Sequence, residues 1–161
     1  MPVAKKKFRE MVFQLLYSHN LSESGRDDMV PMMREQLNVP RSALHQAHER
    51  MLDVLKHQGE FDHLIQEASQ EYEVERIQRV EMNILRLSLY EMIYDDQVPP
   101  KVAISEALRL GKKFSTPESV KFLNAILDSI YKSLDIEEKE SDETKEETFF
   151  NAEDKRKKRA R

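Results

Sequence analysis

The stretch Ile77-Gln-Arg-Val-Glu-Met-Asn-Ile-Leu-Arg-Leu-Ser-Leu-Tyr-Glu-Met-Ile-Tyr94 decides how this chain folds. At the helical period, its apolar side chains form two stripes on nearly opposite sides of one helix. One stripe comprises Val80, Ile84 and Leu87, and the other comprises Met82, Leu85, Leu89, Met92 and Ile93. A helix that is apolar on two sides is the central element of a small core, with other helices packed on both sides.

Two narrow polar wedges separate these stripes, one formed by Glu81 with Ser88 and the other by Asn83 with Arg86. Glu91 falls in the middle of the first apolar stripe. An unpaired charge in a protein core is costly. We therefore expect Glu91 to be paired with a cation or with backbone donors.

The composition of the 161 residues favours helices, because the chain has only 3 Gly and 6 Pro and 35% of its residues are charged. This length suits one domain, or two small lobes that share a core. The absence of Cys excludes disulfides, thiol catalysis and Cys-based zinc sites, and it suits a reducing cytosol. No apolar run approaches the roughly 20 residues that a membrane span needs. We expect a cytoplasmic protein that does not enter a membrane.

Apolar periodicity and helix-start signals predict further helices on either side of the central one. The expected helices run over about 4–19, over a short Met-rich segment near Pro31, from about Leu44 to near Gly59, over Phe61–Ala68, from Pro100 onward, and from Pro117 to about Leu134. Thr116 is the expected cap of the last of these helices. The prediction is an all-α fold of about seven helices in two small bundles that share the central helix.

The chain after Leu134 differs from the rest in composition. Residues 135–154 contain ten acidic residues and two lysines, and residues 155–161 contain six basic residues. Such a composition buries too little apolar surface to fold alone. We expect a folded domain over 1–134 and a disordered charged tail over 135–161. The basic end of the tail either contacts phosphates or keeps the terminus soluble, and the sequence leaves both readings open.

The predicted first helix carries cations and aromatic residues outside its core stripe, which comprises Phe8, Met11, Val12, Leu15 and Leu16. The cations are Lys5, Lys6, Lys7 and Arg9. Phe13 and Tyr17 fall on the side opposite the core stripe. One reading is that both rings pack against a neighbouring lobe, since surfaces carry scattered apolar residues. The other is a stacking platform beside phosphate contacts, as in proteins that bind single-stranded nucleic acid.

His45 and His48 share one face of the predicted third helix, which would suit two ligands of a metal. A closed metal site needs further ligands. No Cys, His or carboxylate cluster in the sequence supplies them convincingly, so we expect neither a metal nor a cofactor.

Many of these residues, at their spacing, resemble the NusB family of bacterial transcription antitermination factors. The resemblance spans residues 4–134 and is densest over 77–128. The matching positions are Arg9-Glu10, Gln14, Leu16-Tyr17, Val80-Glu81, Ile84-Leu85-Arg86-Leu87, Leu89-Tyr90-Glu91, Val98-Pro99-Pro100-Lys101-Val102-Ala103-Ile104, Glu106-Ala107, Lys113-Phe114, Lys121-Phe122, Asn124 and Leu127-Asp128.

The resemblance implies an all-helical fold of about seven helices in two small bundles. It also implies binding to the single-stranded boxA element of nascent ribosomal RNA leaders, together with NusE, which is also a small-subunit ribosomal protein. The pair would then join other Nus factors on RNA polymerase and suppress premature termination. Neither catalysis nor a cofactor belongs to this activity.

The resemblance also implies which residues form the site. The implied RNA-binding residues are Lys5, Lys6, Lys7, Arg9, Tyr17, Lys121 and Phe122, and the residues implied to contact RNA or the partner are Phe13, Glu81 and Glu118. Because a carboxylate repels phosphate, we assign Glu81 and Glu118 to hydrogen bonds with bases or to cations of NusE. Three of the four N-terminal cations are lysines where the family is often rich in arginine, and lysine lacks the bidentate fork of arginine. Position 118 is often Asp in the family and is Glu here, and the charged tail lies outside the family pattern.

Three other interpretations compete with an RNA-binding antitermination factor. NusB-like domains also begin ribosomal RNA cytosine methyltransferases, but such an enzyme needs a catalytic Cys and a Gly-rich cofactor domain, which this chain lacks. A helical interaction module without RNA affinity would leave the cations of the first helix as a solvated end. Alternatively, Phe13 and Tyr17 would form the face of a homodimer.

Overall fold

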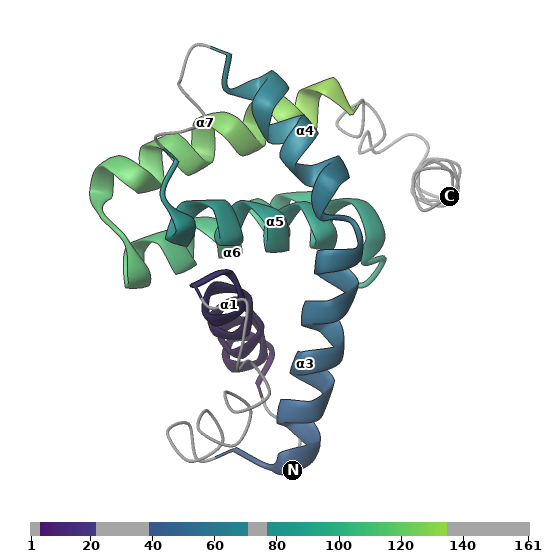
Figure 1. Ribbon diagram of the computed structural model, residues 1–161. Helices are drawn as coiled ribbons and strands as arrows, with labels where there is room; N and C mark the ends of the chain where they lie inside the picture. The colour runs from purple at the N-terminus through teal and green to yellow at the C-terminus, as the bar shows by residue number, and fades with distance from the viewer. Residues whose placement is uncertain (1–3, 22–38, 71–76, 135–161) are drawn as a thin grey trace, which may run out of the picture.

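The computed structural model describes residues 4–21, 39–70 and 77–134, and within these ranges the chain forms six α-helices and no strand (Figure 1). The helices are α1 (Lys5–Leu21), α3 (Arg41–Lys56), α4 (Gln58–Ala68), α5 (Arg79–Tyr94), α6 (Pro100–Phe114) and α7 (Pro117–Ser133). The prediction of an all-α fold is confirmed. The Met-rich helix expected near Pro31 and the tail over 135–161 lie outside the described residues.

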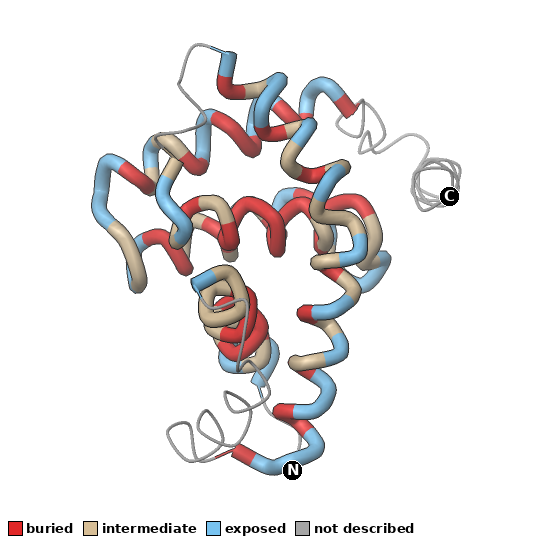
Figure 2. Tube along the Cα trace, in the orientation of Figure 1, coloured by how far each residue is buried: buried red, intermediate tan, exposed pale blue. Residues whose placement is uncertain are grey.

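Helix α5 is the centre of the fold, as its two apolar stripes predicted. It packs against α1 and α3, against α4 and α7, and along α6, while α1 pairs with α3 and α7 pairs with α4 and α6. Buried positions follow one another along almost the whole of α5 (Figure 2). The helix is therefore shared by two groups of helices, and most of its side chains leave water.

The polar wedges of α5 hold neighbouring helices at fixed positions. Buried Arg86 makes a two-pronged pair with Asp62 of α4, with both nitrogen–oxygen distances at 2.9 Å. The hydroxyl of Ser88 donates to the carbonyl oxygen of Ala103 in α6 at 3.1 Å. Because buried polar groups must be satisfied, these contacts specify where α4 and α6 lie against α5.

Helices α6 and α7 pack closely at Gly111 of α6. A Cβ atom at Gly111 would lie 2.8 Å from Cδ1 of Leu123 and 3.9 Å from the Cα atom of Val120 in α7, so α7 lies directly against this glycine. The start of α7 is also as predicted. Thr116 caps the helix, and its hydroxyl oxygen accepts a hydrogen bond from the Ser119 amide at 3.2 Å.

The predicted end of the third helix near Gly59 is wrong. Helix α3 ends at Lys56, and Gly59 lies in the first turn of α4. The chain bends at His57, whose ring stacks on Tyr94 of α5 at a centroid distance of 4.2 Å. The break is therefore set by a tertiary contact and not by the glycine.

Candidate nucleic-acid interface

The basic residues at the start of α1 are free to meet a ligand. Lys5, Lys6 and Lys7 are exposed and form no ion pair with any residue in the described ranges. The first turn of α1 contains no acid. Since the N-terminus of a helix also carries a partial positive charge, this end of α1 favours an anion such as a phosphate.

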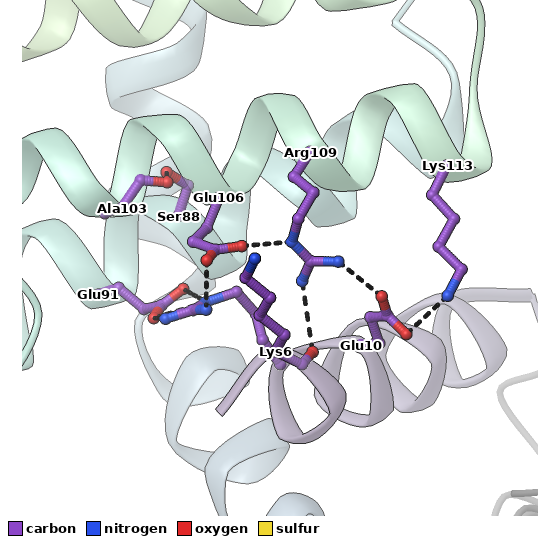
Figure 3. Close-up of polar contacts among 9 residues, drawn as sticks. Lys6, Glu10, Ser88, Glu91, Ala103, Glu106, Arg109 and Lys113 are labelled. Carbon is purple, nitrogen blue, oxygen red and sulfur yellow. Dashed lines mark hydrogen bonds and ion pairs between the residues drawn. The ribbon is translucent and has the colours of Figure 1, made fainter. Parts of the chain in front are cut away.

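Arg9 does not belong to this exposed group, because its guanidinium is buried and paired with a carboxylate; the phosphate contact implied for it stays a prediction. Its side chain is 9% exposed, and it donates hydrogen bonds of 2.7–3.0 Å to both carboxylate oxygens of Glu91 in α5 (Figure 3). Glu106 of α6 lies 3.4 Å from the same guanidinium. The expectation that Glu91 pairs with a cation is confirmed, and Arg9 is the cation.

Burial is the strongest influence on the carboxyl group of Glu91. It raises the pKa of Glu91 above its usual value, while the hydrogen bonds and charge of Arg9 act in the opposite direction. Both side chains are almost out of water, and in the described ranges the hydrogen bonds to the Glu91 carboxylate all come from Arg9, whereas Arg9 also has Glu106 at 3.4 Å. The pair therefore joins the first helix to the central helix inside the core.

A row of polar and aromatic contacts, which we call the α1–α6 seam, joins Lys6, Glu10 and Phe13 of α1 to Arg109, Lys113 and Phe114 of α6. Arg109 donates to Glu10 at 2.7 Å and to the backbone oxygen of Lys6 at 3.3 Å. Lys113 donates to the other carboxylate oxygen of Glu10 at 2.9 Å. Figure 3 shows the side chains of Glu10, Arg109 and Lys113 between the two helices. The seam thus leads from the exposed lysines toward the aromatic residues.

Phe13, at the aromatic end of the seam, is a core residue. It is 2% exposed, and its ring lies 4.9 Å from that of Phe114 and 6.2 Å from that of Tyr17. In this structure Phe13 is therefore not exposed to RNA, to a partner or to a second copy of the chain, and its assignment to RNA or a partner stays a prediction. Of the two readings of these rings, packing against a neighbouring helix is confirmed for Phe13. Tyr17 is half-buried and keeps part of its ring in water.

The start of α7 carries the remaining predicted site residues. Glu81 of α5 is 9% exposed and accepts a hydrogen bond of 2.8 Å from the hydroxyl of Ser119, so its carboxylate is held beside the first turn of α7. Glu118 and Lys121 are exposed, and Phe122 is half-buried. Acids near a helix N-terminus are favourable in themselves, which is a structural reason for Glu81 and Glu118 that needs no ligand.

The structure brings the first helix beside the end of α6, which the start of α7 follows directly in the chain. Sequence reasoning missed the roles of Glu10, Arg109 and Lys113. Arg109 and Lys113 are four residues apart and therefore lie on one side of α6. Their partner Glu10 is 99 residues away from Arg109, and no local pattern reveals such a contact.

The pKa of Glu10 predicts part of the acid sensitivity of the fold. Burial alone would raise this pKa, but hydrogen bonds from Arg109 and Lys113 outweigh it and hold the pKa below the ordinary value of 4.5. Between the two values the unfolded chain binds more protons than the folded one, so acidification favours unfolding. The stabilisation by Glu10 is therefore present above pH 4.5 and lost as the pH falls through the lower, folded-state pKa.

Comparing the protein with a Glu10→Gln variant by urea unfolding between pH 7 and pH 3 tests this. We expect the variant to be less stable near neutral pH by about 1 kcal/mol or less, because the ion pairs are partly exposed. The difference should shrink toward zero in acid. A difference independent of pH would show that Glu10 stabilises through packing alone.

Other kinds of site find no support in the described part of the chain. No group of three or more His, Cys, Asp or Glu residues there could hold a metal ion. His45 lies 3.3 Å from Glu49 on an exposed side of α3. None of the described helices has the length and apolarity to span a bilayer.

The fold and the α1–α6 seam define a class: small all-α proteins in which exposed cations and half-buried rings gather along the first helix and its neighbours. Comparisons with known proteins refine this class. Residues 6–132 match the NusB family. The chain belongs to the NusB family.

Two relatives and two solved structures illustrate the similarity. The transcription antitermination protein NusB of Desulfosudis oleivorans is 32% identical over 134 residues, which cover 81% of this chain and 87% of the relative. That of Chlamydia pneumoniae is 33% identical over 127 residues and 79% of each chain.

The structure of T. maritima NusB matches with a TM-score of 0.69 at 28% identity, covering 82% of this chain and 93% of that one. A structure of the antitermination factors NusB and NusE in complex with double-stranded RNA contains a chain that matches with a TM-score of 0.69 at 26% identity, covering 80% of this chain and 96% of that one.

Proposed function

We propose that this protein is a transcription antitermination factor that binds the boxA element of nascent ribosomal RNA together with NusE. With other Nus factors on RNA polymerase in the cytoplasm, the complex would suppress premature termination. The observation that carries the proposal is the basic start of α1, where three exposed lysines without an ion-pair partner in the described ranges lie at one end of the α1–α6 seam. Membership of the NusB family supports it. A binding role of this kind requires neither catalysis nor a cofactor.

In this mechanism Lys5, Lys6 and Lys7 contact phosphates of single-stranded RNA. Tyr17 and Phe122 are half-buried, so each offers part of a ring to a base or to NusE. The exposed Lys121 adds a cation near Phe122. Phosphate contacts position an RNA and base contacts specify it, so the lysines supply affinity and the rings supply selectivity.

The two acids near α7 would have a different task. The carboxylate of Glu81 is held by Ser119 at 2.8 Å, and a fixed acceptor can read a donor on a base. Glu118 is exposed and can meet a cation of NusE. Because both acids repel phosphate, we place the RNA backbone along the lysines and away from the start of α7.

A filter-binding titration tests the proposal directly. Labelled boxA RNA and a scrambled RNA of equal length are titrated with the protein, with and without NusE, at several salt concentrations. We expect weak binding by the protein alone, and tight binding selective for boxA when NusE is present. Equal affinity for the scrambled RNA in the presence of NusE would refute the proposal.

Replacing Lys5, Lys6 and Lys7 together by glutamine should weaken RNA binding at every sequence. Each phosphate contact on single-stranded RNA contributes about 0.7 to the slope of log affinity against log salt, so the slope should become shallower by roughly 2. The residues are exposed, so the free energy of unfolding should hardly change. The salt slope and a urea unfolding curve measure the two effects.

A helical interaction module without RNA affinity predicts a different result for the same variant. NusE binding would be intact, and RNA binding would be absent both before and after the replacement. Lys132→Gln is the control, because this exposed lysine lies in the last turn of α7, at the opposite end of that helix from Glu118. Its salt slope should equal that of the wild type.

A further inference from the structure

Glu10 is an acid placed among the cations of the proposed interface. Its carboxylate is 2.7 Å from Nη1 of Arg109 and 2.9 Å from Nζ of Lys113. One oxygen of Glu10 binds each cation, and Arg109 also donates to Glu106 at 2.5 Å (Figure 3). The side chains of Arg109 and Lys113 are 27% and 54% exposed, so both cations remain within reach of a ligand in solution.

These two cations lie between the parts of the interface that should bind RNA. Arg109 contacts the backbone oxygen of Lys6, one turn of α1 before Glu10. Lys113 lies 5.6 Å from the centroid of the Phe114 ring, which packs on Phe13 beside Tyr17. An RNA strand that touches the exposed lysines and reaches Tyr17 would pass along Arg109 and Lys113.

Paired with Glu10, the two cations attract phosphate less than free cations do. A phosphate approaching them meets the negative charge of Glu10 and must displace two charge-assisted hydrogen bonds. Phosphate contacts strengthen the binding of any RNA sequence and do not distinguish one sequence from another. Two more free cations beside three lysines would therefore raise affinity for every RNA, including the wrong sequences.

We propose that Glu10 limits non-specific RNA binding at this interface: it withholds Arg109 and Lys113 from RNA phosphates, so that tight binding depends on base and partner contacts. This inference rests on the proposed RNA-binding function and assigns to it a residue that opposes non-specific binding. Glu10 touches no RNA in this role. It acts through the two cations of α6.

The test compares Glu10→Gln with the wild type and with Asp128→Asn. Asp128 pairs with Lys132 at 3.1 Å on the exposed side of α7, so the control makes the same change in net charge and also removes an ion pair with a lysine. Each protein is titrated with boxA RNA and with a scrambled RNA of equal length, with and without NusE, from low to high salt. Far-UV circular dichroism checks that each variant is folded.

We expect Glu10→Gln to bind the scrambled RNA about tenfold more tightly at ~0.1 M salt, with a salt slope steeper by roughly 0.7 for Lys113 alone and roughly 1.4 if Arg109 also leaves Glu106 for a phosphate. The affinity for boxA RNA should rise by a similar factor, because phosphate contacts do not depend on sequence. Asp128→Asn should match the wild type. Adding Arg109→Gln and Lys113→Gln to Glu10→Gln should remove the gain, because no extra cation remains.

An unchanged slope in Glu10→Gln, or an equal gain in Asp128→Asn, would overturn the inference. A second measurement does not alter Glu10 at all: Lys113→Gln should leave the slope unchanged, whereas Lys6→Gln should reduce it by about 0.7. A loss in Lys113→Gln as large as that in Lys6→Gln would also overturn it.

The failure of this inference is distinguishable from failure of the proposed function. If wild-type protein with NusE shows no preference for boxA, the proposed function fails, whatever Glu10 does. If the wild type prefers boxA and Glu10→Gln keeps that preference with an unchanged slope, only the inference about Glu10 fails.

Discussion

Arg9→Met should lower the free energy of unfolding by about 3–5 kcal/mol, the cost of leaving one partner of a buried ion pair alone. The replacement removes the three hydrogen bonds to Glu91 and leaves that carboxylate in the core, where its side chain is 5% exposed. Glu106 still accepts its hydrogen bond from Arg109 at 2.5 Å, so most of the lost stability should come from the unpaired carboxylate of Glu91. Urea unfolding measured by circular dichroism gives the value.

The double variant Arg9→Met, Glu91→Met should recover most of that loss, because replacing a whole buried ion pair by apolar residues of similar size is often neutral or stabilising. The same variant decides what Arg9 does. If Arg9 is structural, the folded double variant binds RNA with the salt slope of the wild type. A slope shallower by about 0.7 would instead mean that Arg9 contacts a phosphate.

Phe13→Ala should also lower the free energy of unfolding by about 3–5 kcal/mol, because it removes a large buried ring and leaves a cavity. Phe13 is 2% exposed and packs on Phe114, which closes α1 against α6. Phe13→Leu should cost much less, since it keeps an apolar side chain of similar volume. Thermal or urea unfolding distinguishes the two variants.

Tyr17→Ala is the matched comparison, since this neighbouring ring is only half-buried. It should cost less stability than Phe13→Ala and should weaken binding of RNA or NusE at temperatures where the protein is folded. If Phe13→Leu impaired binding of RNA or NusE while Tyr17→Ala did not, Phe13 and not Tyr17 would be the residue that contacts the ligand. Phe13 would then have to leave the core when a partner binds.

Much of the fold was predictable because its signals are local. The two stripes of α5 predicted a helix packed on both sides, and Thr116 with Pro117 predicted the start of α7. Gly59 misled the prediction, because an exposed glycine is tolerated in the first turn of a helix and the bend at His57 depends on Tyr94. Local signals are reliable where no distant contact competes with them.

The site was less predictable, because its residues interact across long stretches of the chain. On a helical wheel Arg9 groups with the cations and Phe13 lies opposite the predicted core stripe. Nothing in the first helix indicates which of these positions another helix covers. Once α5 and α6 are in place, Arg9 meets Glu91 and Phe13 meets Phe114, so both leave the surface. Lys5, Lys6 and Lys7 precede these contacts along α1 and stay exposed.

The sequence by itself determined that this protein is all-α, that α5 is its central helix, that Glu91 needs a cation, and that the chain resembles the NusB family. Each of these follows from periodicity, composition or motif spacing, which are properties of neighbouring residues. Only the tertiary structure decided which charges are available to a ligand. The first helix carries four cations near its start. Packing against α5 and α6 buries Arg9 beside Glu91 and pairs Glu10 with Arg109 and Lys113. The other three cations of the helix start, all lysines, stay exposed. The physical reason is that the residue type fixes the charge of a side chain, whereas its burial and its ion-pair partner depend on residues that only folding brings near.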